Sequence, residues 1–473
     1  MKKTYIDTAM ERIAPDLILK GGNVVDVFSG RVIKADVIIK DGIICGVGSY
    51  SGENEQDVSG KYIMPGFIDS HVHIESSMTQ PSEYAKAVMP HGITTVIADP
   101  HEITNVCGED GLEFMLKSAE NIPLDVNLML PSCVPATPFE HTGANLDAKT
   151  TQKLAPKFFG IGEMMNYPGI VSGDDETLGK LCLDIIDGHA PLLSGHELDA
   201  YASAGIKTDH ECSVIEEMTE KISKGMYILL REGTLSLDVA KLIKGVTPYT
   251  LRRCAFCTDD RFVGEIIRDG SIDHCIRKAV SLGLNNIDAI IMATLNACEM
   301  YGMKNKGAIA PSYVADIVVA DDLNLSSISQ VYKNGKLVCE NGKALFECET
   351  VDNSKVTNTV HLPKISADFF KTDVKDKFDA IELIPESIIT KKVTVSYSDS
   401  LSKVCVIERH HNLGTKGIGF VTNYGITNGA IATSIGHDSH NVIVIGDNDS
   451  DMALAVNTLA TSGGIAVCSE GKV

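Results

Sequence analysis

The sequence lacks an excess of basic residues and lacks any long hydrophobic run. It carries 42 Lys and Arg against 63 Asp and Glu in 473 residues, so its formal net charge at pH 7 is −21. No Lys- or Arg-rich patch offsets this charge locally, which makes nucleic acid and anionic membranes poor partners. The apolar stretches, such as residues 442–445, are far shorter than the roughly 20 residues that a transmembrane helix requires. A small neutral or cationic ligand is compatible with this charge.

An apolar leader and a regular cysteine pattern are also missing. The first residues, MKKTYIDTAMERIAPD, contain no apolar run of the kind found in signal peptides. The 13 cysteines are odd in number and irregularly spaced, so we expect reduced thiols and a cytoplasmic location. With 44% hydrophobic and 22% charged residues, the composition is that of a soluble globular protein.

Three kinds of pattern divide the chain. Residues 1–62 and 308–346 both resemble short antiparallel strands with tight turns, which predicts a small composite β-sandwich domain built from both flanks of an insert. In the insert, residues 63–307, short apolar segments alternate with helical patterns, of which one covers residues 112–121. Eight such units in about 250 residues predict an α/β fold of the (β/α)8 TIM-barrel type. The predicted barrel strands are residues 66–71, 94–98, 126–130, 160–164, 183–187, 206–209, 227–230 and 254–258.

Residues 360–473 form a predicted C-terminal α+β domain. The last segment of the sequence, GGIAVCSEGKV, resembles one strand and a turn without a returning strand, so we expect this domain to be incomplete. Its predicted elements are strands at residues 393–397, 404–407 and 442–445 and a helix at residues 452–459.

The strongest local signal is PGFIDSHVHIE at residues 65–75. Residues two apart on a strand point to the same side, so His71 and His73 present two imidazoles together. They lie at the carboxyl end of the strand, where barrels of this type build their active sites. Later strand ends add potential ligands for one or two divalent metal ions. These ligands are Glu163, His189, His210 and Asp259.

A charged residue at a single strand end is usually only solvated, and other histidines leave alternatives open. His196 is a rival of His189, although it lies in a pattern typical of a helix start. His101 and Glu102, at the end of the second strand, are candidates for an additional metal. The HDSHN segment at residues 437–441 is either a buried polar network or a lid that contributes a contact to the barrel site.

Several motifs together resemble the bacterial adenine deaminases of the amidohydrolase superfamily. They are HVHIESSM, ADPHEI, DGHAP, TDHE and HDSHN, which begin at His71, Ala98, Asp187, Thr208 and His437. The resemblance extends over essentially the whole chain, although this family usually continues beyond the position of Val473.

This resemblance implies a binuclear centre of Mn²⁺ or Fe²⁺, with Zn²⁺ as a further option. His71 and His73 would bind one ion, and Asp259 would bind the same ion and accept a proton. The second ion would be bound by His189 and His210, with Glu163 as the bridge between the two ions.

The implied reaction is the hydrolytic deamination of adenine to hypoxanthine and ammonia, in purine salvage, by a metal-bridged hydroxide. Asp259, Glu102 and Glu75 are the expected catalytic residues, and Glu211 and Ser77 the expected substrate contacts. A homo-oligomer acting on a small molecule and water is expected. The alternatives are another cyclic amidohydrolase, similar to dihydroorotases or hydantoinases, and a metal-free scaffold with the amidohydrolase fold.

Overall fold

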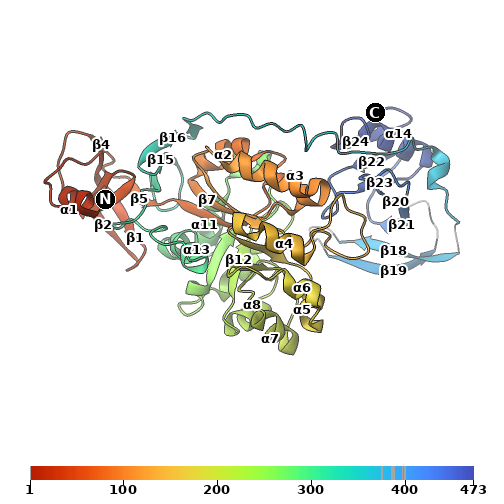
Figure 1. The fold of residues 1–473 in the computed structure, drawn as a ribbon, viewed down its shortest axis with the longest axis horizontal. Helices are drawn as coiled ribbons and strands as arrows, with labels where there is room; N and C mark the ends of the chain where they lie inside the picture. Colours follow the sequence, from red (N-terminus) through yellow and green to blue (C-terminus); the bar gives the residue numbers. More distant parts are fainter. Residues whose placement is uncertain (1, 374–375, 385–388, 397, 399–400) are drawn as a thin grey trace. The chain divides into compact units, whose positions relative to one another are not determined.

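A computed structural model describes residues 2–373, 376–384, 389–396, 398 and 401–473 (Figure 1). The chain forms two compact units. The barrel unit comprises Met1–Pro100, Met115–Leu130 and Ala148–Val351, and the C-terminal unit comprises His101–Phe114, Pro131–Asp147 and Asp352–Val473.

A nine-stranded sheet in the barrel unit combines strands from both flanks of the barrel sequence. Strand β5 pairs in parallel with β1 and antiparallel with β14, and thereby joins the two flanks. The turn between β2 and β3 places Asp41 and Gly42 at φ values of 49° and 75°, as a tight hairpin of this type requires. The strands are β1 (Leu17–Asp26), β2 (Arg31–Lys40), β3 (Ile43–Gly48), β4 (Glu55–Asp57), β5 (Tyr62–Pro65), β14 (Ile317–Ala320), β15 (Ile328–Lys333), β16 (Lys336–Glu340) and β17 (Lys343–Ala344).

Eight short parallel strands, paired as one sheet of five and one of three, form the curled arrangement that was predicted as a TIM-type barrel, and this fold class is confirmed. Their side chains are mostly buried, which explains their continuous apolar sequences. The sheet closes where Val72 forms a parallel bridge with Asp259. The strands are β6 (Phe67–Val72), β7 (Ile93–Ala98), β8 (Asp125–Leu130), β9 (Gly160–Met164), β10 (Ile186–Gly188), β11 (Thr208–Asp209), β12 (Tyr227–Arg231) and β13 (Cys254–Cys257).

Helices follow most barrel strands and pack with one apolar face inward, as α11 does through Ile272, Cys275, Ile276 and Ala279. Among the helices of the described residues, none combines the length and the apolar character needed to cross a bilayer. The helices before the C-terminal sheet are α1 (Lys2–Ala9), α2 (Pro81–Val88), α3 (His101–Ala119), α4 (Ala148–Leu154), α5 (Tyr167–Ser172), α6 (Asp175–Gly179), α7 (Gly195–Ser203), α8 (Ile215–Ser223), α9 (Val239–Leu242), α10 (Val263–Asp269), α11 (Ile272–Ser281), α12 (Asn286–Met292) and α13 (Leu295–Met300).

Helix α3 corrects one prediction. It begins at His101, eleven residues before the helix predicted for residues 112–121, and it is interrupted at Gly108, where φ is 58°. His101 and Glu102 therefore occupy the first helical turn, and not the end of a strand. The reason is Pro100, which has no backbone N–H for a strand ladder and is well tolerated at a helix start.

The C-terminal unit contains a seven-stranded sheet against which helix α14 (Asp449–Leu459) packs, with Val442, Val444, Met452 and Val456 in the shared core. The helix begins three residues before the predicted one because the Asn448 side chain accepts the Asp451 N–H as a cap. Tyr397, the last residue of the strand predicted for residues 393–397, lies outside the described residues. The strands are β18 (Lys377–Leu383), β19 (Thr390–Ser396), β20 (Ser402–Ile407), β21 (Lys416–Thr422), β22 (Gly429–Thr433), β23 (Val442–Gly446) and β24 (Ile465–Ser469).

A fully buried lysine links α8 to the end of β11. Lys221 Nζ donates to Asp209 Oδ2 at 2.9 Å and to Glu217 Oε1 at 2.7 Å. In a Lys221→Met variant both carboxylates lose their cation, so we expect the free energy of unfolding to fall by about 3–5 kcal/mol. Urea denaturation measures this change. Lys224→Met, at an exposed ion pair after the same helix, is the control and leaves the urea midpoint nearly unchanged; equal shifts in the two variants would contradict this account.

Candidate metal centre

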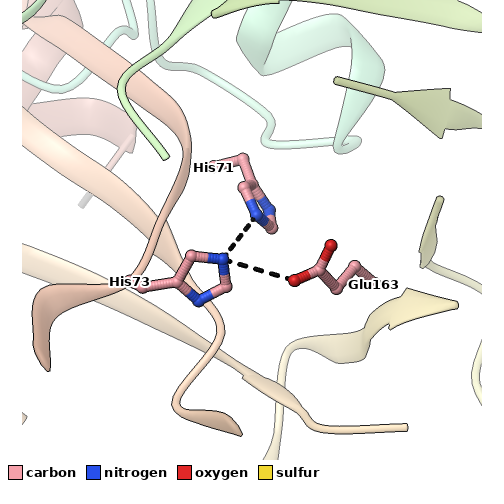
Figure 2. Close-up of side chains that lie close together, drawn as sticks. All are labelled: His71, His73 and Glu163. Atoms are coloured by element: carbon pink, nitrogen blue, oxygen red, sulfur yellow. Dashed lines mark hydrogen bonds and ion pairs between the residues drawn. The ribbon is translucent and has the colours of Figure 1, made fainter. Parts of the chain in front are cut away.

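The end of β6 brings two buried imidazoles together. The Nε2 atoms of His71 and His73 lie 3.0 Å apart, and Figure 2 shows the two rings meeting beside Glu163. His73 Nδ1–H donates to the backbone carbonyl of Asp99 at 2.8 Å. Because Nδ1 carries the proton, the lone pair is on His73 Nε2, the atom that faces the cluster. A histidine that binds a metal through one ring nitrogen typically donates its other N–H in this way.

Glu163 on β9 lies between two groups of histidines. Its Oε1 is 3.3 Å from His73 Nε2, while its Oε2 is 2.6 Å from His189 Nδ1 and 3.2 Å from His210 Nε2. The Glu163 N–H donates to Asp99 Oδ2 at 2.9 Å, which holds this part of β9. One buried carboxylate thus faces histidines on both sides, an arrangement that suits a ligand shared by two cations.

His189 and His210 follow β10 and β11 directly. The N–H of His189 donates to the Tyr201 hydroxyl at 2.9 Å, which ties the residue to α7. The His210 ring stacks on that of His71 with the ring centroids 4.1 Å apart. These contacts place all four imidazoles around Glu163.

Asp259 lies two residues after the end of β13 and has an unusual backbone conformation. Its φ is 58°, in the left-handed region that non-glycine residues rarely adopt and that is frequent at functional sites. This conformation places Asp259 Oδ1 3.2 Å from His73 Nε2 and 3.6 Å from His71 Nε2. Asp259 is therefore positioned as a further oxygen donor on the side of His71 and His73.

The electrostatics of the cluster favour positive charge. Burial alone would lower the pKa of His189, but the adjacent Glu163 carboxylate raises it to about 9. Burial likewise opposes charge on His210, yet hydrogen bonding to Glu163 raises the pKa of His210. Burial would raise the pKa of Glu163, but His189 holds it well below its ordinary range. Divalent cations would satisfy the same carboxylates and displace these protons, so the donor set fits metal ions.

Arg231, at the end of β12, was missed by the sequence prediction, which ended this strand at residue 230. Its Nη1 donates to Asp259 Oδ2 at 2.9 Å, its Nη2 to Glu211 Oε2 at 3.2 Å, and its Nε to Asp238 Oδ2 at 3.1 Å. Burial would lower the pKa of Arg231, but Asp259 raises it, so the side chain stays a cation. The signal that could have identified Arg231 is a charged residue at the end of an apolar strand, the same signal that identified the candidate metal ligands at the other strand ends.

The remaining predicted residues occupy different surroundings. Glu211 lies at the cluster, with Oε1 3.6 Å from His210 Nε2. Glu75 and Ser77 belong to the 3-10 helix η1 (Ile74–Ser77), directly after His73, and the Ser77 hydroxyl donates to the backbone carbonyl of Ile74 at 2.6 Å.

The remaining candidates are His196 and Glu102. The structure places His189 beside Glu163, whereas the rival His196 lies on α7 with its side chain exposed. Glu102 belongs to the C-terminal unit, where its Oε1 is 3.5 Å from His437 Nδ1.

Comparison with known proteins identifies the family. Residues 62–338 match the amidohydrolase family, and residues 383–473 match the adenine deaminase C-terminal domain. An adenine deaminase of Clostridium acetobutylicum is 47% identical over 99% of this chain and 86% of its own length. The chain belongs to the adenine deaminase family. A second member, from Nitratidesulfovibrio vulgaris, is 44% identical over 99% of this chain and 85% of its own length.

Solved structures show that this adenine deaminase family member shares its fold with other amidohydrolases. An enamidase aligns with a TM-score of 0.53 at 18% identity, over 70% of this chain and 97% of the enamidase. A β-aspartyl dipeptidase from Fervidobacterium islandicum aligns with a TM-score of 0.52 at 20% identity, over 71% of this chain and 99% of the dipeptidase. At such identities the likeness concerns the fold alone.

A glycine on β9 controls the position of Glu163. A Cβ atom on Gly162 would clash with Asp99 Oδ2, the acceptor of the Glu163 N–H. We expect Gly162→Ala to displace Asp99 and Glu163 and to lower metal affinity by about 10- to 100-fold, the usual effect of disturbing an outer contact. Equilibrium dialysis against Mn²⁺ measures this affinity. The matched control is Gly264→Ala on α10, where the added methyl group meets open space; unchanged affinity in Gly162→Ala would refute the argument.

Proposed function

We propose that this protein is an adenine aminohydrolase, which converts adenine and water into hypoxanthine and ammonia. The observation that carries the proposal is the Glu163 carboxylate, whose two oxygens face histidines on opposite sides. Its relatives of similar length are named adenine deaminases, which supports adenine as the substrate.

In this proposal the cluster holds two divalent ions. His71, His73 and Asp259 would bind the first ion, His189 and His210 would bind the second, and Glu163 would be shared by both. Mn²⁺ or Fe²⁺ is the proposed metal, with Zn²⁺ as a further option, because mixed imidazole and carboxylate donors suit all three. When bound, the two ions act as Lewis acids and make a water molecule acidic enough to attack at neutral pH.

The protein's own side chains handle the protons. Asp259 accepts a proton from the water that adds to C6 of adenine, and delivers it to the amino group that leaves as ammonia. Arg231 keeps Asp259 oriented through its 2.9 Å hydrogen bond. Glu75 and Glu102 are the proposed proton donors to the ring nitrogen, which keeps this proton in hypoxanthine.

Glu211 and Ser77 are the proposed substrate contacts. Glu211 is supported by its position 3.6 Å from His210 Nε2. The Ser77 hydroxyl already donates to the Ile74 carbonyl, so it would have to accept a hydrogen bond from the substrate or exchange its present bond for one to the substrate.

The cellular setting of the proposed enzyme is purine salvage in the cytoplasm. The cysteines of the chain are free thiols, which fits a reducing compartment. Adenine is uncharged at pH 7, so the net charge of −21 does not oppose its binding. We further propose that the protein is a homo-oligomer, which light scattering of the purified protein tests. It is proposed to have no nucleic-acid or membrane partner.

The substrate is tested with protein from Mn²⁺-supplemented growth whose metal content has been measured. We expect adenine to lose its ultraviolet band as hypoxanthine and ammonia form, whereas dihydroorotate and hydantoin remain unchanged. Absence of adenine turnover at full metal occupancy would overturn the proposal, and ring opening would favour a different cyclic amidohydrolase. Absence of tightly bound metal would favour a scaffold.

Two substitutions separate metal binding from proton transfer. His71→Ala removes a buried imidazole of the cluster, and we expect loss of both metal and activity. Asp259→Asn keeps an oxygen donor but removes the proton acceptor, so we expect most of the metal to remain while kcat falls by about 100- to 10 000-fold. Metal analysis combined with the adenine assay measures both effects, and an active Asp259→Asn variant would exclude the proton-transfer role.

A further inference from the structure

A second group of histidines and carboxylates lies within the C-terminal unit. Ligand atoms of His101, His437 and Asp438 all lie within 4.8 Å of one another. His101 Nε2 is 3.5 Å from Asp438 Oδ1. His101 is the first residue of α3, while His437 and Asp438 lie in the loop between β22 and β23, so the group joins two distant parts of the chain. We propose that these three residues form a further binding site for a divalent transition-metal ion.

The donor chemistry favours a transition metal. Two imidazoles and one carboxylate are the donors that Zn²⁺, Mn²⁺ and Fe²⁺ take in proteins, whereas Mg²⁺ and Ca²⁺ prefer oxygen donors alone. His101 is only 2% exposed, so a bound ion would be largely shielded from bulk water on that side. A fourth position remains for water or another donor, as in sites with three protein ligands.

Glu102 supplies the outer contact that metal-binding histidines usually have. Its Oε1 lies 3.5 Å from Nδ1 of His437, and the side chain is 2% exposed. A carboxylate that faces one ring nitrogen fixes the orientation of the imidazole and directs the other nitrogen toward the ion. Glu102 is therefore a positioning residue of the proposed site.

The loop that carries His437 and Asp438 is held by hydrogen bonds on several sides. His410 Nε2–H donates to the Ser439 carbonyl at 2.9 Å, and Asn441 Nδ2 donates to the His141 carbonyl at 2.8 Å. The His440 N–H donates to the Gly436 carbonyl at 2.7 Å, which closes the loop on itself. Such fixed ligand positions are what a metal site requires.

His440 adds a third imidazole beside the group. Its ring centroid is 5.2 Å from that of His437, and its Nε2 is buried and accepts or donates no hydrogen bond among the described residues. Its φ of 54° is uncommon for a histidine and is a form of strain often found at functional sites. A buried ring nitrogen of this kind is stabilised when an ion or its water ligand approaches it.

A pocket lies beside His437. A pocket of about 490 Å³ is lined by His437 together with Glu140, His141, Lys416 and Asn441. The His437 side chain is 38% exposed, so the ring is accessible to solvent. An ion can therefore enter without unfolding of the C-terminal unit.

The experiment counts bound ions in the full-length chain. Chelator-treated wild type, His437→Ala and Asp438→Asn are each dialysed against Mn²⁺ and, separately, against Zn²⁺, and the bound metal is measured by mass spectrometry. We expect each variant to bind one equivalent less than wild type with at least one of the two ions. Glu102→Gln is expected to retain the ion with about 10- to 100-fold weaker affinity.

His361→Ala is the matched control, because His361 is an exposed histidine of the same unit. It should bind as much metal as wild type, and circular dichroism verifies that every variant is folded. Wild-type metal content in both His437→Ala and Asp438→Asn, with both ions, would overturn the proposal and leave a buried polar network as the explanation. The adenine assay on wild type is separate, so failure of this site and failure of the proposed deaminase activity are distinguishable.

Discussion

Two backbone hydrogen bonds join the carboxyl ends of β6 and β13. The Asp259 N–H donates to the His71 carbonyl at 3.0 Å, and the His73 N–H donates to the Asp259 carbonyl at 3.2 Å. These bonds close the barrel and hold Asp259 in its left-handed conformation beside two imidazoles. The remaining candidate ligands lie at the ends of β9, β10 and β11, whose carboxyl ends meet at the same edge because the barrel strands are parallel. The whole candidate site depends on this closure.

Buried charge is the second constraint on the barrel unit. Glu163, Asp259 and Glu211 are all less than 9% exposed, and buried carboxylates are costly unless they are paired. Arg231 compensates Asp259 and Glu211, while histidines surround Glu163. The remaining demand for positive charge is what two divalent ions would satisfy. The same need to pair buried charges explains Lys221, which neutralises Asp209 and Glu217 and so holds the end of β11.

Much of the fold could be predicted from the sequence because its signals are local. Apolar segments of strand length mark the eight barrel strands, and β9 was predicted with its observed bounds. The start of α3 was missed because the helix is interrupted at Gly108, which separates its first residues from the apolar pattern at residues 112–121. Arg231 was missed because the predicted strand ended at residue 230, one residue before this side chain, which the structure places on β12 and beside Asp259.

The sequence by itself determined which residue types stand at the strand ends, because period-two spacing and the transition from apolar to polar residues are properties of neighbouring positions. Only the tertiary structure decided which of them meet. It placed His189 and not His196 beside Glu163, and it joined Arg231 to Asp259. It also brought His437 to His101 within the C-terminal unit. These contacts depend on the order of the strands, the closure of the barrel and the paths of the loops, which bring together residues that are distant along the chain.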